Sequence, residues 1–269
     1  MSARSADALL RLARWPNVLL AATGVAFGAW WVGWGDASRI ALAALGAACL
    51  TVTANVWNDL ADIAIDRRAH PERALPSGLV TERTARRLAG CTGVAGVALE
   101  ALGAPALGAL SVLAVALMYA YSPWIKRTGL PGNLLVAVLA SLPFLYGGWV
   151  VGHPRSAIAL VMIAVPLHLA REIAKDLDDA PADAGSRRTL PVSAGVSAAI
   201  AVLSAASLAF LLLLVPFATE RPRFAAAAVP AAALVLYAVA IAVRGHRGSP
   251  LVFKLAMLCT MAAFLTARP

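Results

Sequence analysis

Residues 40–66 read IALAALGAACLTVTANVWNDLADIAID, an apolar run that passes without a break into a segment rich in carboxylates. Its first nineteen residues carry no charge, and a helix needs about 20 apolar residues to cross a hydrocarbon core about 30 Å thick. The run therefore predicts a membrane-spanning helix whose last turns carry Asp59, Asp62 and Asp66.

The rest of the chain repeats the apolar part of this pattern. Of its 269 residues 61% are hydrophobic and only 14% are charged, which is unlike the composition of soluble domains. Further apolar segments lie at about 16–34, 88–104, 106–122, 130–151, 156–172, 191–215, 224–243 and 250–266. Together with 40–58 they predict an all-α membrane protein with about nine transmembrane helices in a single domain, residues 1–269. The segments that meet at residues 104–105 are either a tight hairpin or one interrupted span.

Basic residues indicate how these spans are oriented. With the N-terminus in the cytoplasm, eighteen of the 23 Lys and Arg residues fall on the cytoplasmic side, as the positive-inside rule requires. We therefore expect an integral protein of the cytoplasmic membrane without a cleaved leader. The net charge of +9 comes from short loops rather than a basic stripe, which argues against nucleic-acid binding. No obligate protein partner is indicated. The three cysteines lack the spacing of a zinc site or disulfide frame.

Ten of the fourteen acidic residues fall in two segments on the predicted cytoplasmic side. In the first, Asn58, Asp62 and Asp66 are spaced i, i+4 and i+8, which places them on one helix face. In the second, Asp176, Asp179 and Asp183 are spaced i, i+3 and i+7, although Pro181 could end the helix before Asp183. Stacked carboxylates repel one another, so they favour a hard cation such as Mg²⁺. Two such faces would suit two Mg²⁺ ions bridging a diphosphate. A solvated, charged loop end is the competing interpretation of either segment alone.

Several motifs occur together in the order found in one known family. The first segment is followed by Arg73-Ala-Leu-Pro-Ser-Gly78, and the second reads Arg171-Glu-Ile-Ala-Lys175-Asp176-Leu-Asp178-Asp179 and leads to Thr189-Leu-Pro191. Between them lie Tyr121, Lys126 and Pro131-Gly-Asn133. From residue 14 to residue 191 this set resembles the UbiA superfamily of intramembrane prenyltransferases. The resemblance implies one helical bundle around a central cavity, with its active site facing the cytoplasm.

The resemblance also implies the chemistry and the residues that perform it. A polyprenyl diphosphate, the donor, would lose its diphosphate with the help of two Mg²⁺ ions, and a small or lipid acceptor would capture the prenyl group. The implied metal ligands are Asn58, Asp59, Asp62, Asp66, Asp176, Asp179 and Asp183. Catalytic roles fall to Asp62, Asp66, Asp176, Asp179, Lys126 and Tyr121, and substrate binding to Arg73, Asn133, Arg171, Lys175 and Asn17.

Each of these assignments has a simpler alternative. Lys126, Arg73, Arg171 and Lys175 could be cytoplasmic anchors that only fix the topology. Tyr121 could belong to the aromatic belt at the membrane interface rather than face an allyl cation. Asn133 could cap the start of its helix. His168 is intramembrane, and a packed histidine is the simpler interpretation.

The sequence offers more than one class of acceptor. The Arg-Glu-Ile-x-Lys-Asp run and the Thr-Leu-Pro ending resemble the branch that adds geranylgeranyl to a glycerol-phosphate lipid. Aromatic acceptors such as 4-hydroxybenzoate, homogentisate or a chlorophyllide are the alternative. A cation-coupled transporter is an alternative of another class, but transporters place their binding groups near the membrane midplane, whereas these acids gather at one edge.

Overall fold

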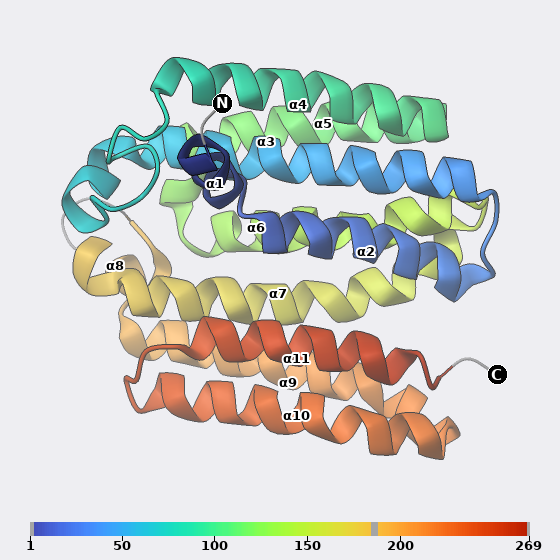
Figure 1. Ribbon diagram of the computed structural model, residues 1–269. Coiled ribbons are helices and arrows are strands. Elements are labelled where there is room, and N and C mark those ends of the chain that lie inside the picture. The colour runs from blue at the N-terminus through green and yellow to red at the C-terminus, as the bar shows by residue number, and fades with distance from the viewer. Residues whose placement is uncertain (1–2, 184–187, 268–269) are drawn as a thin grey trace. The chain divides into compact units, whose positions relative to one another are not determined.

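The computed structural model describes residues 3–183 and 188–267, and throughout this part of the chain the regular structure is helical, without a strand (Figure 1). The α-helices are α1 (Ala3–Ala13), α2 (Trp15–Val32), α3 (Ala37–Ala69), α4 (Glu82–Gly103), α5 (Pro105–Ala120), α6 (Leu130–Val150), α7 (Pro154–Asp183), α8 (Leu190–Ala194), α9 (Val196–Glu220), α10 (Pro222–Val243) and α11 (Ser249–Phe264). A π-helix, η1 (Tyr121–Ile125), and a 3₁₀-helix, η2 (Lys126–Thr128), join α5 to α6.

The predicted apolar segments are helical, but the segment 191–215 is divided at Gly195, whose φ is 90°, into α8 and α9. Among the described residues, five helices have the length and composition to cross a membrane, namely Ala37–Arg68, Leu130–Val150, Pro154–Pro181, Val196–Glu220 and Pro222–Val243. Helices α5 and α11 are apolar but shorter. The choice left open at residues 104–105 is decided as a hairpin, because Ala104 has an extended backbone and α5 packs against α4.

The end of α3 agrees with the prediction, whereas α7 is not ended by Pro181. Helix α3 continues through the whole acidic segment to Ala69, and α7 continues past Pro181 to Asp183.

At the start of α3 the carboxylate of Asp36 accepts hydrogen bonds from the amides of Ser38 (2.8 Å) and Arg39 (3.4 Å). A hydrogen bond from the Ser38 hydroxyl, together with these two amide bonds, holds the pKa of Asp36 below its ordinary value of 3.8.

The chain folds as two compact units. The first comprises residues 3–125 and 142–158, and the second comprises residues 126–141 and 159–267 with the gap at 184–187. In the first unit α3 packs along α4 and α2, and α4 packs along α5 (Figure 1). In the second unit α10 packs along α11 and α9.

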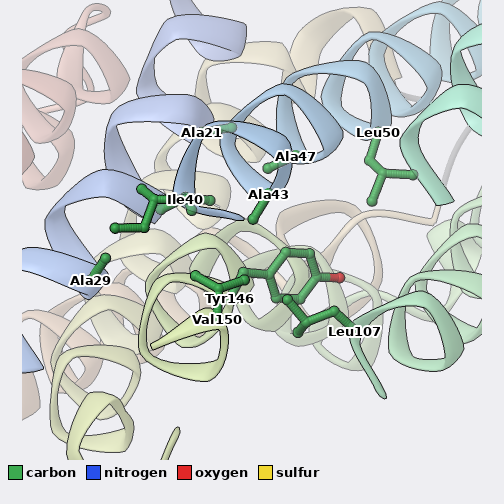
Figure 2. Packing of buried hydrophobic residues seen from close by; sticks show 10 residues of the cluster. Ala21, Ala29, Ile40, Ala43, Ala47, Leu50, Leu107, Tyr146 and Val150 are labelled. Carbon is green, nitrogen blue, oxygen red and sulfur yellow. The ribbon is translucent and has the colours of Figure 1, made fainter. Parts of the chain in front are cut away.

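Small side chains bring the helices of the first unit close together. Figure 2 shows the ring of Tyr146 beside Leu107, with Ala43 and Ala47 of α3 nearby. Without a hydrophobic driving force between helices in lipid, such small residues are what permits close packing. The Tyr146 hydroxyl lies 3.4 Å from Ser111 Oγ in this core.

Helices α2 and α6 approach most closely at a pair of glycines. A Cβ at Gly28 would lie 2.1 Å from the carbonyl oxygen of Phe144, and a Cβ at Gly147 would lie 2.0 Å from that of Val25. Backbone therefore rests directly on backbone at this crossing, and neither position has room for a methyl group.

A second apolar cluster lies beneath the polar end of α3. It joins Ala8 and Leu12 of α1 to Val56 and Leu60 of α3, and it includes residues of α4 and of the turn between α3 and α4, namely Ala74, Leu75, Val80, Ala85 and Ala89. This turn is folded rather than loose, because the amide of Val80 donates to the carbonyl of Ala74 (3.0 Å) and that of Ser77 to Arg73 (3.0 Å). The cluster thereby holds α1 and residue 73 close to the acidic segment.

Candidate functional site

The acidic end of α3 presents two different polar faces. Asn58, Asp62 and Asp66 follow the i, i+4, i+8 spacing on one continuous helix, so they share a face as predicted. Asp62 and Asp66 are buried, with 7% and 3% of their surface exposed, and Asn58 is half-buried. Asn55 and Asp59, also four residues apart, form the second face.

Arg73 lies against the first face. Its Nη1 donates to Oδ2 of Asp66 at 2.8 Å, and the side chain of Asp66 is almost fully enclosed whereas that of Arg73 is 40% exposed. A buried carboxylate is costly unless it is paired, so the folded turn that carries Arg73 supplies the counter-charge for Asp66.

The second face holds the junction between α1 and α2. Arg14 donates to the carboxylate of Asp59 through Nη2, and Nδ2 of Asn55 donates to the carbonyl oxygen of Ala13 at 2.8 Å. Arg14 adopts a left-handed backbone with φ of 54°, a conformation that persists only where surrounding contacts enforce it. Asp59, one of the predicted metal ligands, is therefore engaged by an arginine from the N-terminal junction.

Aromatic side chains lie beside the same end of α3. The rings of Trp57 and Tyr119 lie with their centroids 4.3 Å apart and their planes tilted by 51°, and Trp57 Nε1 donates to the carbonyl oxygen of Tyr119 at 3.4 Å. Tyr121 opens the π-helix η1, a type of element that is frequent at functional sites. The structure places Tyr121, Lys126 and Asn17 half-buried, at the start of η1, the start of η2 and the first turn of α2 respectively.

In the second unit the end of α7 carries the other predicted residues. Asp176 accepts a hydrogen bond from Nδ2 of Asn133 at 2.8 Å. Lys175 and Asp179 are half-buried on the same helix. Asp183 ends α7, and its side chain lies outside the described residues.

Two neighbouring acids in this unit have structural partners. Arg171 pairs with Glu172, the next residue along α7. Asp178 accepts a hydrogen bond from the amide of Gly248 at 3.0 Å, which fastens the loop before α11 to α7. The structure thus brings Asn133 to Asp176, and it pairs Arg171 with an acid of its own helix.

The donor chemistry at both helix ends suits a hard cation. The candidate ligands are carboxylate and amide oxygens, which Mg²⁺ prefers over nitrogen or sulfur. Within the described ranges, no three His, Cys, Asp or Glu side chains gather closely enough to hold an ion by themselves. Mg²⁺ commonly takes one or two carboxylates and completes its octahedron with waters and phosphate oxygens, so the residues fit a metal that arrives with a diphosphate.

The sequence interpretation missed the roles of Arg14 and Asn55. Arg14 enters the sequence analysis as one of the cytoplasmic basic residues and as the first residue of the family-like stretch, and Asn55 has no role there. The sequence contains one signal for this face, because Asn55 stands four residues before Asp59 on one helix. The partner of Asp59 is Arg14, 45 residues earlier in the chain, and spacing alone cannot identify it.

Long apolar helices, one of which buries carboxylates beside arginines at its end, define an integral membrane protein with an enzyme-like polar site. The chain matches the UbiA prenyltransferase family over residues 18–264 and belongs to this family of prenyltransferases.

Individual relatives support the same assignment. The chain is 35% identical to the digeranylgeranylglyceryl phosphate synthase of Methanopyrus kandleri over 273 aligned residues, covering 97% of this chain and 98% of that protein. Its fold is similar to the apo structure of a UbiA homologue from Aeropyrum pernix K1, with a TM-score of 0.78, 19% identity and coverage of 93% and 95% of the two chains. A UbiA homologue from Archaeoglobus fulgidus bound to DMAPP and Mg²⁺ aligns with a TM-score of 0.70, 20% identity and coverage of 96% and 99%.

Proposed function

We propose that this chain transfers a geranylgeranyl group from its diphosphate to the hydroxyl of a glycerol-phosphate lipid. The observation that carries the proposal is the 35% identity to a digeranylgeranylglyceryl phosphate synthase across nearly the whole of both chains. The acidic ends of α3 and α7, with their oxygen donors, support the use of a metal-bound diphosphate.

In the proposed reaction the C1–O bond of the allylic diphosphate breaks and the diphosphate leaves with the bonding electrons. The acceptor hydroxyl oxygen bonds to C1 and releases its proton. Two Mg²⁺ ions would supply Lewis-acid stabilisation of the departing phosphate oxygens. Asn58, Asp62 and Asp66 of α3 and Asp176, Asp179 and Asp183 of α7 are the proposed ligands.

Positive side chains bind the phosphate groups in this proposal. Lys126 and Arg73 contact the diphosphate, since a point charge and a bidentate fork both suit phosphate oxygens. Arg171, Lys175 and Asn17 bind substrate groups. The face of Tyr121 steadies the allyl cation by cation–π attraction. Asp59 is left with a supporting role, because Arg14 engages it.

We further propose that residues 1–269 are one catalytic domain with nine spans in the cytoplasmic membrane. The N-terminus and the active site face the cytoplasm. This topology is supported by the excess of Lys and Arg that it places in cytoplasmic loops.

A direct assay tests the function. Purified protein in lipid nanodiscs is incubated with Mg²⁺, geranylgeranyl diphosphate and either geranylgeranylglyceryl phosphate or 4-hydroxybenzoate, and products are identified by mass spectrometry. We expect a doubly geranylgeranylated glycerol-phosphate lipid, no product when EDTA removes the metal, and at least a 100-fold loss for Asp62→Ala and for Asp176→Ala.

The outcomes separate the alternatives. A product from 4-hydroxybenzoate alone would replace the lipid acceptor by an aromatic one. Undiminished turnover by both aspartate variants would overturn the proposed metal sites. Absence of any prenylated product, from a protein that is folded by its melting transition, would overturn the proposed reaction.

A further inference from the structure

Asn133 is a polar residue in direct contact with the second acidic segment. It lies in the first turn of α6 and is 7% exposed. Its Nδ2 donates to Oδ2 of Asp176, 43 residues further along the chain, at 2.8 Å. A bond of this length to a charged acceptor lies in the stronger class of protein hydrogen bonds.

The chemistry of the Asn133–Asp176 pair determines which atom of the Asn133 amide faces the carboxylate. An ionised carboxylate only accepts hydrogen bonds, so the amide must turn its nitrogen toward Asp176. A hydrogen bond to Oδ2 restricts the rotation of the Asp176 carboxylate, and it thereby favours one direction for the plane of the group. A carboxylate in water has no such constraint.

The turn before α6 holds Asn133 in place. Gly129 has φ of +71°, which favours glycine, and its carbonyl oxygen accepts from the amide of Asn133 at 3.2 Å. A Cβ at Gly129 would lie 3.5 Å from Ser193 Oγ and 3.7 Å from Leu190 Cα. The start of α6 therefore rests on the short helix α8, and Asn133 projects from a packed support.

We propose that Asn133 is a positioning residue that orients the carboxylate of Asp176 for metal binding. The inference rests on the proposed function, in which Asp176 is a Mg²⁺ ligand. It gives Asn133 a role other than the predicted substrate binding, because Nδ2 of Asn133 donates to Asp176.

The test measures the Mg²⁺ dependence of two processes. One is the binding of inorganic pyrophosphate to the full-length protein in nanodiscs, followed by calorimetry, and the other is prenyl transfer. For Asn133→Ala and for the more shape-preserving Asn133→Leu we expect the Mg²⁺ concentration at half-saturation to rise about 10- to 100-fold in both. At saturating Mg²⁺ kcat should recover to within a few-fold, and the KM for the prenyl donor should change little.

Ser141→Ala is the matched control. Ser141 is buried on the same helix, but its hydroxyl bonds the carbonyl of Ala137 (2.8 Å) one turn earlier. This variant should keep the wild-type Mg²⁺ dependence. If either Asn133 variant that retains a cooperative melting transition also keeps the wild-type half-saturation, the inference is overturned.

The result also distinguishes this inference from the proposed function. Wild-type protein that neither binds pyrophosphate with Mg²⁺ nor forms product would refute the function, and the inference with it. Wild-type activity combined with a raised donor KM but an unshifted Mg²⁺ dependence in the Asn133 variants would refute the inference alone and assign Asn133 to the substrate.

Discussion

Two of the three buried carboxylates of α3 have arginine partners from neighbouring segments. Asp66 is paired with Arg73 and Asp59 with Arg14, so each of these two charges is compensated locally. Removing one partner of such a pair leaves a desolvated charge, which costs more than the pair itself contributes.

We predict that Arg73→Gln destabilises the metal-free protein. Asp66 is enclosed and would lose its guanidinium, at a cost of about 1–3 kcal/mol in the free energy of unfolding. Thermal unfolding in detergent with EDTA measures the effect. Arg67→Gln is the control, because the Arg67–Glu82 pair spans 3.4 Å between side chains that are 59% and 42% exposed. Exposed pairs contribute about 0.2–1 kcal/mol. Equal melting temperatures for the two variants would contradict the prediction.

Sequence spacing succeeds at the residue level where the partners share a helix. The shared face of Asn58, Asp62 and Asp66 follows from helical periodicity alone. The partners of those residues do not, because Arg73 is delivered by a folded turn and Arg14 by a junction between two helices. Whether these side chains bind metal and diphosphate stays a prediction, which the assays above test.

At the scale of elements, the junction of α1 and α2 is fastened to α3 by two polar contacts, one from Asn55 and one from Asp59. The apolar contacts of Ala8 and Leu12 add to them. The position of helix α1 therefore depends on polar contacts at its C-terminal end and on the apolar contacts of its own side chains.

Arg14→Gln should loosen α1 without unfolding the unit. Loss of the ion pair with Asp59 removes a charge-assisted hydrogen bond, so amide hydrogen exchange in residues 3–13 should become about tenfold faster or more. Arg11→Gln is the control, because Arg11 pairs with Asp7 (2.8 Å) between side chains that are 76% and 59% exposed. Unchanged exchange in Arg14→Gln would mean that apolar packing alone holds α1.

The crossing of α2 and α6 makes a steric prediction. Gly28→Ala and Gly147→Ala would each drive a methyl group into a carbonyl oxygen at 2.1 or 2.0 Å, so each should cost about 3 kcal/mol or more in unfolding free energy. Gly90→Ala in α4 is the control. A Cβ there meets no described atom within 4 Å, and alanine should stabilise the helix by about 0.5–1 kcal/mol. Melting temperatures that rank these variants otherwise would contradict the crossing.

The cap of α3 predicts a pH dependence. Because the folded protein lowers the pKa of Asp36, its carboxylate stabilises the fold above the ordinary value of 3.8, and this contribution is lost as pH falls through the lower folded value. Asp36→Asn keeps a capping side chain but cannot ionise. The difference in melting temperature between wild type and Asp36→Asn should therefore shrink as the pH is lowered from 6 to about 2. A constant difference would exclude the carboxylate as its source.

The sequence predicts that most of the helices exist, but it does not predict where each of them begins and ends. Apolar length identified every long helix, since the bilayer sets that length. Helix α1 was missed because it is amphipathic and short, so hydropathy gives no signal for it. The break at Ala104 has a local cause, because the residue before a proline avoids the helical backbone. The passage of α7 through Pro181 has no such cause, because local propensity disfavours proline inside a helix.

On the scale of the whole molecule, the solved relatives have the same fold although only about 20% of their residues are identical. The pattern of apolar residues along the chain is set by the membrane rather than by any specific sequence. The number of spans and the side of the N-terminus stay predictions. They rest on the distribution of Lys and Arg.

Cysteine accessibility tests that topology. In a background with Cys49, Cys91 and Cys259 replaced by serine, Ser77→Cys should be protected from an impermeant maleimide in intact cells and His153→Cys should react. Both residues are exposed, and the nine-span arrangement puts them on opposite sides of the membrane. After permeabilisation both should react. Labelling of Ser77→Cys in intact cells would overturn the cytoplasmic assignment of the acidic helix ends.

The ion pair between Arg14 and Asp59 attaches the N-terminal helix to the acidic end of α3. A chain that lacks residues 1–14 would lose the guanidinium that pairs with Asp59. A cation from solvent would then have to take its place. The requirement of this shortened chain for salt and for divalent ions should consequently change even though every membrane span is intact.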